Sequence, residues 1–219
     1  MTDVDSKVVN IDAVVPVGKR QQKTQRRRRE LSAVVTRLVE ERGFDSISVS
    51  EVAEEASISV GGLYRYIKTK NDLLELVCDE INLELLEQMK AAADAEKGIR
   101  NKLKAAISHY WLKHWKASAA IIVAYREYQS FSKAASQRYA RQEREIVEYL
   151  ADLIRAGVLV EEFRDVDARL LAYEIILLAH MRALKAHAVK DKDPDFVLEE
   201  HLELIFSRLN PTNQSGAKT

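Results

Sequence analysis

The sequence predicts an all-α protein, in which an N-terminal three-helix domain precedes a larger C-terminal helical domain, with about nine helices in total. Helix-forming residues dominate the composition, and 7 Gly and 3 Pro are too few for the turns of a many-stranded fold. Apolar residues recur at steps of three and four along most of the chain, which is the helical period. With 219 residues and 47% hydrophobic content, the chain can bury a sizeable core.

Composition also excludes several classes of protein. The 34 Lys and Arg balance the 34 Asp and Glu, so the net charge indicates no partner. A single cysteine, Cys78, rules out a disulfide framework and favours a reducing compartment. The longest apolar runs, 119–125 and 175–179, are too short to cross a membrane, and the N-terminus lacks a signal-peptide pattern. We therefore expect a cytoplasmic protein.

The charges are distributed unevenly along the chain. Residues 1–18 carry three acids and one base, whereas residues 19–70 carry twelve bases and seven acids. The first seven of those bases lie in residues 19–29, where there is no acid. Such a block is either a solvated arm or a contact for a polyanion. We expect residues 1–25 to form a disordered basic arm.

Residues 26–70 carry the signals of a helix-turn-helix domain. An amphipathic helix is expected from Arg26 to Gly43, where glycine ends it. Ser48 and Glu51 have the spacing of a capping box at the start of a short second helix. A third helix is expected to start at Ser57 or Ser59 and to end around residues 68–70. Two short helices behind a longer one form a helix-turn-helix.

Gly61 and Gly62 stand where the third helix begins. A glycine within a helix costs about 1 kcal/mol relative to alanine, so another requirement must offset it. Close packing against a neighbouring helix explains one of the two. Clearance to enter the major groove of DNA is the functional alternative. Tyr64 has two alternative roles, a DNA contact or a cap on the small core.

The segment from Arg42 to Leu74 resembles the DNA-binding domain of TetR/AcrR-type transcriptional regulators, with matching spacing throughout. It departs from the family pattern at Ser57, which replaces a turn glycine and predicts mild strain, at Val60, which replaces a polar residue, and at Ile67, which replaces Phe. The resemblance and the basic block together predict contacts to DNA from Arg26, Arg27, Arg28, Ser48, Ser50, Ser59, Val60, Gly61, Tyr64, Arg65, Tyr66 and Lys70. It implies a nucleoid-associated regulator, most simply a repressor.

Residues 71–210 are expected to form a helical effector-binding and dimerisation domain, followed by a disordered tail at 211–219. Helices are expected at 71–95, from Gly98 to Trp115, at 117–130, and from 132 to 156 with Gly157 as the stop. The next, capped by Asp165 or Asp167, should run to about residue 188 and is apolar nearly all round. The last helix starts at Asp193 and Pro194.

The surplus apolar surface of the last two helices predicts a homodimer formed through them. The resemblance implies the same arrangement, because two recognition helices must lie about one turn of DNA apart, roughly 34–36 Å, to bind a palindromic operator. It further implies that an effector tilts the long helix at 71–95 and thereby changes this separation.

The same helices would enclose an effector pocket. Aromatic residues at helical spacing are more often core than ligand contacts, but they are the candidates here: Tyr110, Trp111, His114, Trp115, Tyr125, Tyr128, Tyr149, Tyr173 and His180. A weak resemblance to TetR-type regulators of lipid and acyl-CoA catabolism implies a small hydrophobic effector, either an acyl-CoA, a fatty acid or an aromatic compound.

Neither a metal nor a cofactor nor an enzyme activity is predicted. His109 and His114 are five residues apart, which is off the i, i+4 spacing of a helical metal pair, and His180 and His187 are two turns apart. No phosphate-binding loop or activated nucleophile is apparent. The alternative to a ligand-responsive repressor is a DNA-binding protein of the same fold that recruits a protein partner, as in nucleoid-occlusion relatives.

Overall fold

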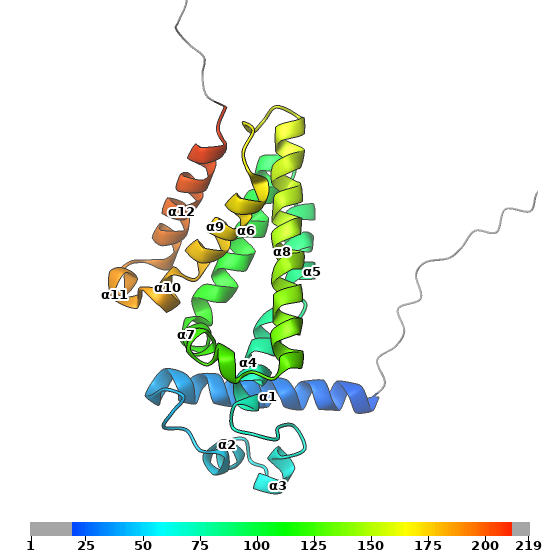
Figure 1. The fold of residues 1–219 in the computed structure, drawn as a ribbon, viewed down its shortest axis with the longest axis vertical. Helices are drawn as coiled ribbons and strands as arrows, with labels where there is room; N and C mark the ends of the chain where they lie inside the picture. Colours follow the sequence, from blue (N-terminus) through cyan, green and yellow to red (C-terminus); the bar gives the residue numbers. More distant parts are fainter. Residues whose placement is uncertain (1–18, 212–219) are drawn as a thin grey trace, which may run out of the picture.

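The computed structural model describes residues 19–211, and every regular element among these residues is a helix (Figure 1). The elements are α1 (Lys19–Arg42), α2 (Val49–Glu55), α3 (Val60–Leu63), α4 (Asp72–Asn82), α5 (Leu85–Asp94), α6 (Ile99–Lys116), α7 (Ser118–Arg126), a 3-10 turn η1 (Tyr128–Ser130), α8 (Lys133–Leu159), α9 (Ala168–Ala179), α10 (Met181–Leu184), α11 (Ala186–Val189) and α12 (Pro194–Leu209). The predicted all-α class is confirmed. The number of helical segments exceeds nine because three predicted helices are interrupted, among them the one expected at 117–130, which ends as α7 at Arg126 and is followed by η1.

Helix α1 lies across one end of the C-terminal helices, with α2 and α3 on its outer side (Figure 1). It begins at Lys19, so residues 19–25 are helical, although we expected the arm to extend to residue 25. Residues 1–18 and 212–219 of the predicted arm and tail lie outside the described residues. The basic block is thus held on a rigid element next to α3.

Local signals set the bounds of α2 and α3. The predicted capping box is present: the Glu51 amide donates to Ser48 Oγ at 3.1 Å, and the Ser48 amide donates to Glu51 Oε2 at 3.5 Å. Ser57, in the turn, has a φ of 53°, which is the strain expected where the family has glycine. Helix α3 spans only four residues and then tightens into turns, so it is shorter than predicted.

The prediction of a single helix at 71–95 is wrong, because the helix is interrupted between α4 and α5. Leu83 is extended and Glu84 is left-handed, with a φ of 57°. The Asn82 side chain donates to the Cys78 carbonyl at 2.9 Å, the group that ends the helical ladder there. Residues 71–95 therefore form two helices, α4 and α5, instead of one.

Gly157 does not stop α8 as predicted, since the helix continues to Leu159. A Cβ at Gly157 would lie 2.1 Å from the ring of Phe163, in the segment that leads back to α9. Glycine is required here for close approach of that ring rather than for a left-handed conformation. Asp167, one of the two predicted caps, accepts from the first amides of α9.

The prediction of one continuous helix up to residue 188 is also wrong, because this segment is divided into α9, α10 and α11 at His180 and Lys185. It is not buried on all sides either, since Leu170 and Leu177 are more than half exposed. Helix α12 starts as predicted, with Asp193 as N-cap and Pro194 in the first turn.

Two apolar cores hold the described residues together. One core joins α5, α6, α8, α9 and α12. The other joins α1, α2 and α3 to α4, α7 and the start of α8. Helix α4 thus packs in the same core as the helix-turn-helix, across the boundary predicted at residue 70. No helix within residues 19–211 is long and apolar enough to span a membrane.

Candidate DNA-binding and effector sites

The start of α3 presents small groups to the outside. Ser59 Oγ accepts from the Gly62 amide at 3.0 Å and caps the helix. A Cβ at Gly61 would meet nothing within 4 Å, whereas one at Gly62 would lie 3.1 Å from Ser59 Oγ. Gly62 is therefore explained by local packing. Gly61 is not, and the space outside it is open to another molecule.

The two tyrosines that follow differ in their surroundings. Tyr64 is 52% exposed and does not cap the small core, which was the alternative role. Tyr66 is half-buried against the core shared with α4. Val60 is exposed beside Gly61. The exposed surface of α3 thus has apolar, aromatic and small groups side by side.

A basic groove runs between α1 and α3. Lys23, Arg26 and Arg27 line it from α1, and Ser59, Gly62 and Arg65 line it from the α3 segment. Arg26 has 83% of its side chain exposed and forms an ion pair with Glu30 at 3.0 Å. Arg27 also pairs with Glu30, at 2.8 Å. The groove has four basic residues and one acid, which suits a phosphate backbone.

Other predicted DNA contacts have partners within the chain. Arg28 points away from the groove and pairs with Asp79 of α4 at 2.8 Å. Lys70 donates to the Asp45 carbonyl at 2.9 Å and lies 4.8 Å from the centre of the Phe44 ring. Ser48 is occupied in capping α2. Ser50 remains exposed at the start of α2.

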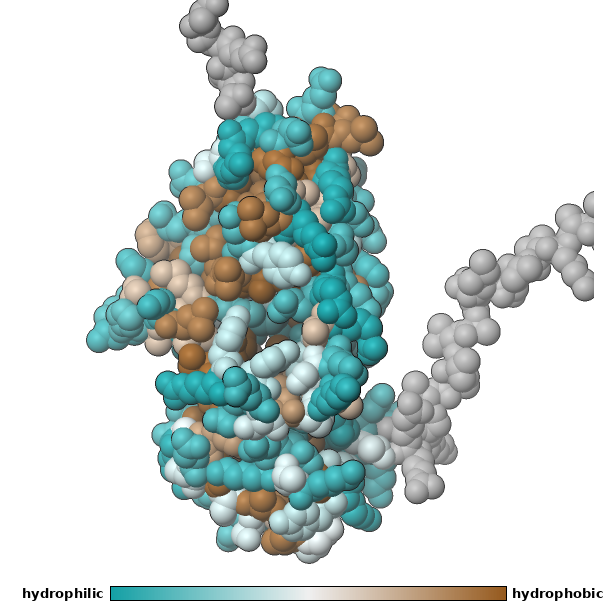
Figure 2. Space-filling view, in the orientation of Figure 1, coloured by the Kyte–Doolittle hydropathy of each residue, from teal (hydrophilic) through white to brown (hydrophobic). Residues whose placement is uncertain are grey.

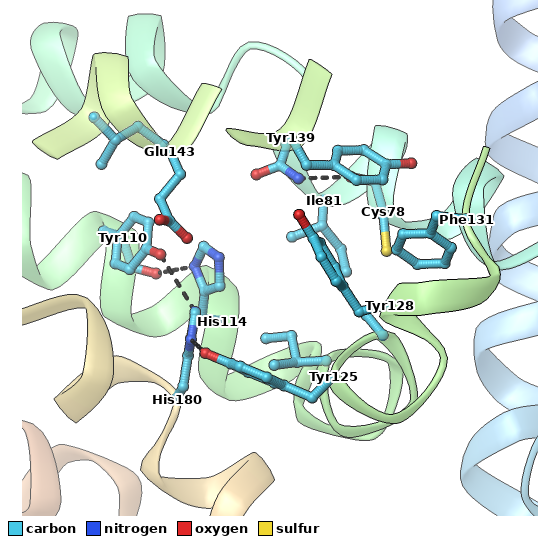
Figure 3. Close-up of a pocket in the computed structure, with 14 residues that line it drawn as sticks. Cys78, Ile81, Tyr110, His114, Tyr125, Tyr128, Phe131, Tyr139, Glu143 and His180 are labelled. Atoms are coloured by element: carbon cyan, nitrogen blue, oxygen red, sulfur yellow. Dashed lines mark hydrogen bonds between the residues drawn. The ribbon is translucent and has the colours of Figure 1, made fainter. Parts of the chain in front are cut away.

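A pocket of about 200 Å³ opens between α4, α6, α7 and α8, and His180, which follows α9, also lines it (Figure 3). It brings together five of the nine predicted pocket residues, and the full lining is Cys78, Ile81, Asn82, Tyr110, His114, Ile121, Ala124, Tyr125, Tyr128, Phe131, Tyr139, Glu143, Ile146 and His180. Tyr125 and Tyr128 are about half exposed and stand at its mouth. A cavity of about 150 Å³ holds benzene, so this pocket has room for a substituted ring or a short acyl chain.

The inner wall of the pocket is a bonded cluster of rings (Figure 3). His180 bonds the hydroxyl of Tyr125 at 2.9 Å through Nδ1 and that of Tyr110 at 3.3 Å through Nε2. His114 stacks on Tyr110, with ring centroids 3.9 Å apart. Burial lowers the pKa of His114 to about 3 and that of His180 to about 4, so both imidazoles are neutral at pH 7.

The other four predicted residues do not line the pocket. Trp111 and Trp115 stack on each other in the core, and Trp111 donates to Nδ1 of His201 at 3.0 Å. Tyr149 and Tyr173 are half-buried at the edge of the same core. These four side chains follow the more common rule that helically spaced aromatics pack in the core.

Residues that the sequence reading missed complete the pocket. Glu143 and Tyr139 project from α8, and Cys78 and Asn82 project from α4. Burial raises the pKa of the Glu143 carboxyl, and it raises that of the Cys78 thiol to about 12, so Cys78 is an unreactive wall group. Within residues 19–211, no group of His, Cys, Asp and Glu side chains is placed to hold a metal ion.

Next to the pocket, Asp79 joins three helices. It accepts from Arg28 of α1 at 2.8 Å, and from Arg138 of α8 at 2.7 Å and 2.9 Å. Tyr139, which lines the pocket, lies 3.2 Å from the same carboxylate and donates to the Glu75 carbonyl at 2.8 Å. Asp79 therefore links Tyr139 of the pocket wall to Arg28 on the helix that carries the basic groove.

The fold and the exposed helix start define a helix-turn-helix regulator. Residues 33–77 match the model of bacterial regulatory proteins of the tetR family, and residues 96–183 match that of the tetracyclin repressor-like C-terminal domain. These two matches span more than half of the chain. The chain belongs to the TetR/AcrR family, and it is a DNA-binding transcriptional regulator.

Individual relatives are more distant. The transcriptional regulator HbdR of Aromatoleum sp. (strain CIB) is 27% identical over 184 residues, which cover 81% of this chain and 76% of HbdR. The nucleoid occlusion factor SlmA of Haemophilus influenzae is 28% identical over 79 residues, only 36% of each protein. The structure of AibR in complex with isovaleryl coenzyme A and operator DNA superposes with a TM-score of 0.67 at 18% identity, covering 82% of this chain and 98% of AibR. That likeness shows a shared fold.

Proposed function

We propose that this regulator is a dimeric repressor that binds a palindromic operator and is released when a small hydrophobic or acyl-type molecule enters the pocket. The observation that carries the proposal is that α4 contributes both to the pocket and to the contact with α1. Its residue Cys78 lines the pocket, and the adjacent Asp79 pairs with Arg28 of α1. A ligand that shifts α4 therefore acts on the basic groove through one ion pair.

The reading surface is proposed to be the exposed start of α3 together with the groove beside it. Gly61 allows the backbone to approach base edges, and Tyr64 stands exposed one turn further on. Lys23 and Arg26 flank them at the position where a first helix crosses the phosphates. Arg28 is left out of this surface because its guanidinium faces α4.

The dimer is proposed to form through α9 and α12. Leu170 and Leu177, two turns apart on α9, are 56% and 55% exposed. On α12, Phe196 and Leu204 are 52% and 58% exposed. Figure 2 shows hydrophobic side chains gathered on the face that these helices form. A second copy of the chain, related by a twofold axis, would bury this face and complete a four-helix interface.

The size of the pocket supports a small effector. A ring or short acyl chain fills about 200 Å³, whereas the coenzyme part of an acyl-CoA would have to remain outside the mouth at Tyr125 and Tyr128. AibR, which shares the fold, was crystallised with isovaleryl coenzyme A and operator DNA. An acyl-CoA with a short acyl group thus remains one candidate beside free aromatic compounds.

The test starts with selection of bound duplexes from a random pool, followed by fluorescence anisotropy on the recovered DNA. Compounds are then added to the preformed complex. A coupling free energy of about 1–3 kcal/mol corresponds to a 5- to 150-fold loss of DNA affinity. Tight binding to DNA that no acyl-CoA, fatty acid or aromatic compound weakens would contradict ligand control. It would favour the alternative in which the helical domain recruits a protein.

A further inference from the structure

Two polar groups of the pocket, His114 and Glu143, offer acceptors to a ligand, whereas the Asn82 amide is a donor that already gives one N–H to the Cys78 carbonyl at 2.9 Å. His114 Nδ1 lies 2.9 Å from the Tyr110 carbonyl, which can only accept, so Nδ1 carries the proton and Nε2 has a free lone pair. Glu143, an exposed residue of α8, points into the same space (Figure 3), and its carboxylate has no hydrogen bond or ion pair among the described residues. Tyr110 and Tyr125 both bond His180, and a neutral imidazole donates to only one of them, so one of these two hydroxyls keeps an O–H that can donate to a ligand.

The lining also lacks positive charge. Among the described residues, neither Lys nor Arg lines the pocket. The two histidines cannot replace them, because burial lowers the pKa of both and their rings lie 4.9 Å apart, so that each would repel a charge on the other. An acid group placed here would lose its water without gaining a cation, and it would face Glu143.

The remaining surface is apolar and aromatic. Tyr110, Tyr125, Tyr128, Phe131 and Tyr139 surround the cavity. Such rings accommodate a flat apolar body, and their faces also attract an organic cation.

We infer that the pocket binds a ring-sized apolar ligand whose buried end carries a hydrogen-bond donor, either a hydroxyl or an ammonium group, and no acid group. The donor bonds His114 Nε2 and the Glu143 carboxylate, and the rings hold the apolar body. This inference rests on the proposed ligand-responsive function, and it excludes a fatty acid bound with its carboxylate inward.

The test uses one ring with four different head groups: 4-propylphenol, 4-propylbenzylamine, 4-propylanisole and 4-propylbenzoate. Isothermal titration calorimetry with the full chain at pH 7.5 measures each Kd. We expect the phenol or the amine to bind at least about tenfold more tightly than the anisole, which lacks the donor, with the benzoate weakest of all.

The Glu143→Gln variant then distinguishes a hydroxyl donor from an ammonium donor. Loss of the negative charge should weaken the amine at least about tenfold and the phenol much less, and the new amide donor should strengthen the benzoate. Glu145→Gln is the matched control, since it removes the same charge from an exposed position on α8 outside the pocket, and it should change none of the four values.

Three results would overturn the inference: tightest binding by the benzoate, equal binding of the phenol, amine and anisole, or no binding by any member. Tight binding of the benzoate would leave ligand control intact while refuting the donor requirement. Failure of ligand control itself is detected separately, by the DNA-release experiment above.

Discussion

Gly61 and Gly157 both lie in helices, but the space around a Cβ at the two positions differs: it is open at Gly61 and filled at Gly157. A Cβ at Gly61 meets nothing within 4 Å, whereas a Cβ at Gly157 would lie 2.1 Å from Phe163. Alanine is the better helix former by about 1 kcal/mol, so only a steric or functional demand can justify glycine at either place. For Gly157 that demand lies within the chain. For Gly61 no contact among the described residues accounts for it, and clearance for DNA is the proposed demand.

Gly61→Ala should therefore raise the free energy of unfolding by up to about 1 kcal/mol and at the same time weaken DNA binding. The added methyl group stabilises the isolated helix but occupies the space through which the backbone approaches DNA. Urea denaturation and anisotropy on the same preparation measure the two effects. Gly157→Ala, the control, should lower the free energy of unfolding by about 1–3 kcal/mol through the clash with Phe163. Unchanged DNA affinity in Gly61→Ala would refute the clearance argument.

Tyr64→Ala should abolish specific DNA binding and leave the fold and the dimer intact, because the side chain is 52% exposed and lies outside the small core. Tyr128→Ala is a matched control, since Tyr128 is equally exposed but lies at the mouth of the pocket. It should bind DNA normally in the absence of ligand. Loss of the dimer in Tyr64→Ala would instead assign Tyr64 a structural role.

The pocket residues differ in how far the sequence could predict them. His180 and Tyr125 were predicted pocket residues and do meet there, although they are 55 residues apart. Glu143 was not predicted, because it stands in a stretch of charged residues where a solvated helix face is the ordinary expectation. Its position facing the cavity depends on how α8 is rotated against α6, which no local pattern records.

Among the helices, α1 carries cations on two faces with different roles. Lys23 and Arg26 line the groove beside α3, whereas Arg28 faces α4 and pairs with Asp79. The sequence identified the basic block but could not distinguish its faces, because it contains no apolar residue that would show which side is buried.

The salt dependence of DNA binding tests whether Lys23 and Arg26 contact phosphates while Arg28 does not. Each phosphate contact contributes about 0.9 to the slope of log affinity against log salt. Lys23→Gln combined with Arg26→Gln removes up to four contacts from a dimer, so the slope should flatten by about 3 to 4. Arg28→Gln should leave the slope unchanged and alter ligand-induced release, since it breaks the link to α4. Equal flattening by both variants would show that Arg28 also contacts phosphates.

The two breaks that interrupt predicted helices at Leu83 and Glu84 and at His180 share one property. Neither the break at Leu83 and Glu84 nor the one at His180 contains Gly or Pro, so periodicity alone continued both helices. Side-chain hydrogen bonds occur at both breaks. At the first, Asn82 donates to the Cys78 carbonyl, and at the second, His180 bonds the hydroxyls of two tyrosines. By contrast, α2 and α12 were placed correctly because their caps are local in sequence.

The stability of the whole molecule should depend on pH through its buried histidines. The pKa of His114 is lowered to about 3 and that of His180 to about 4, against about 6.5 in the unfolded chain. Below pH 6.5 the unfolded state takes up protons that the folded state does not, so stability is lost as pH falls from 6.5 towards 4. Each of these histidines should lower the free energy of unfolding by about 2 kcal/mol at pH 5 relative to pH 7.

Urea denaturation at pH 7 and pH 5 checks this expectation. His180→Asn should show a smaller difference between the two pH values than the wild type does. His187→Asn, at an exposed position, should keep the full difference. A wild-type protein equally stable at both pH values would contradict the buried, neutral state of the ring cluster.

The functional assembly is the level at which all these features must act together. In the proposed assembly each chain contributes its exposed α3, and the apolar face on α9 and α12 joins two chains so that they read a palindrome together. Leu177→Glu should place a charge in this face and yield monomers at micromolar concentration, whereas Leu159→Glu, at the exposed end of α8, should not.

Native mass spectrometry of the protein with a duplex recovered from a random pool tests the central claim most directly. We expect one species containing two chains and one duplex for the wild type, and only free duplex with monomeric Leu177→Glu at the same concentration. A complex of one chain with one duplex, or no complex with any recovered duplex at low ionic strength, would contradict a regulator that reads DNA as a pair.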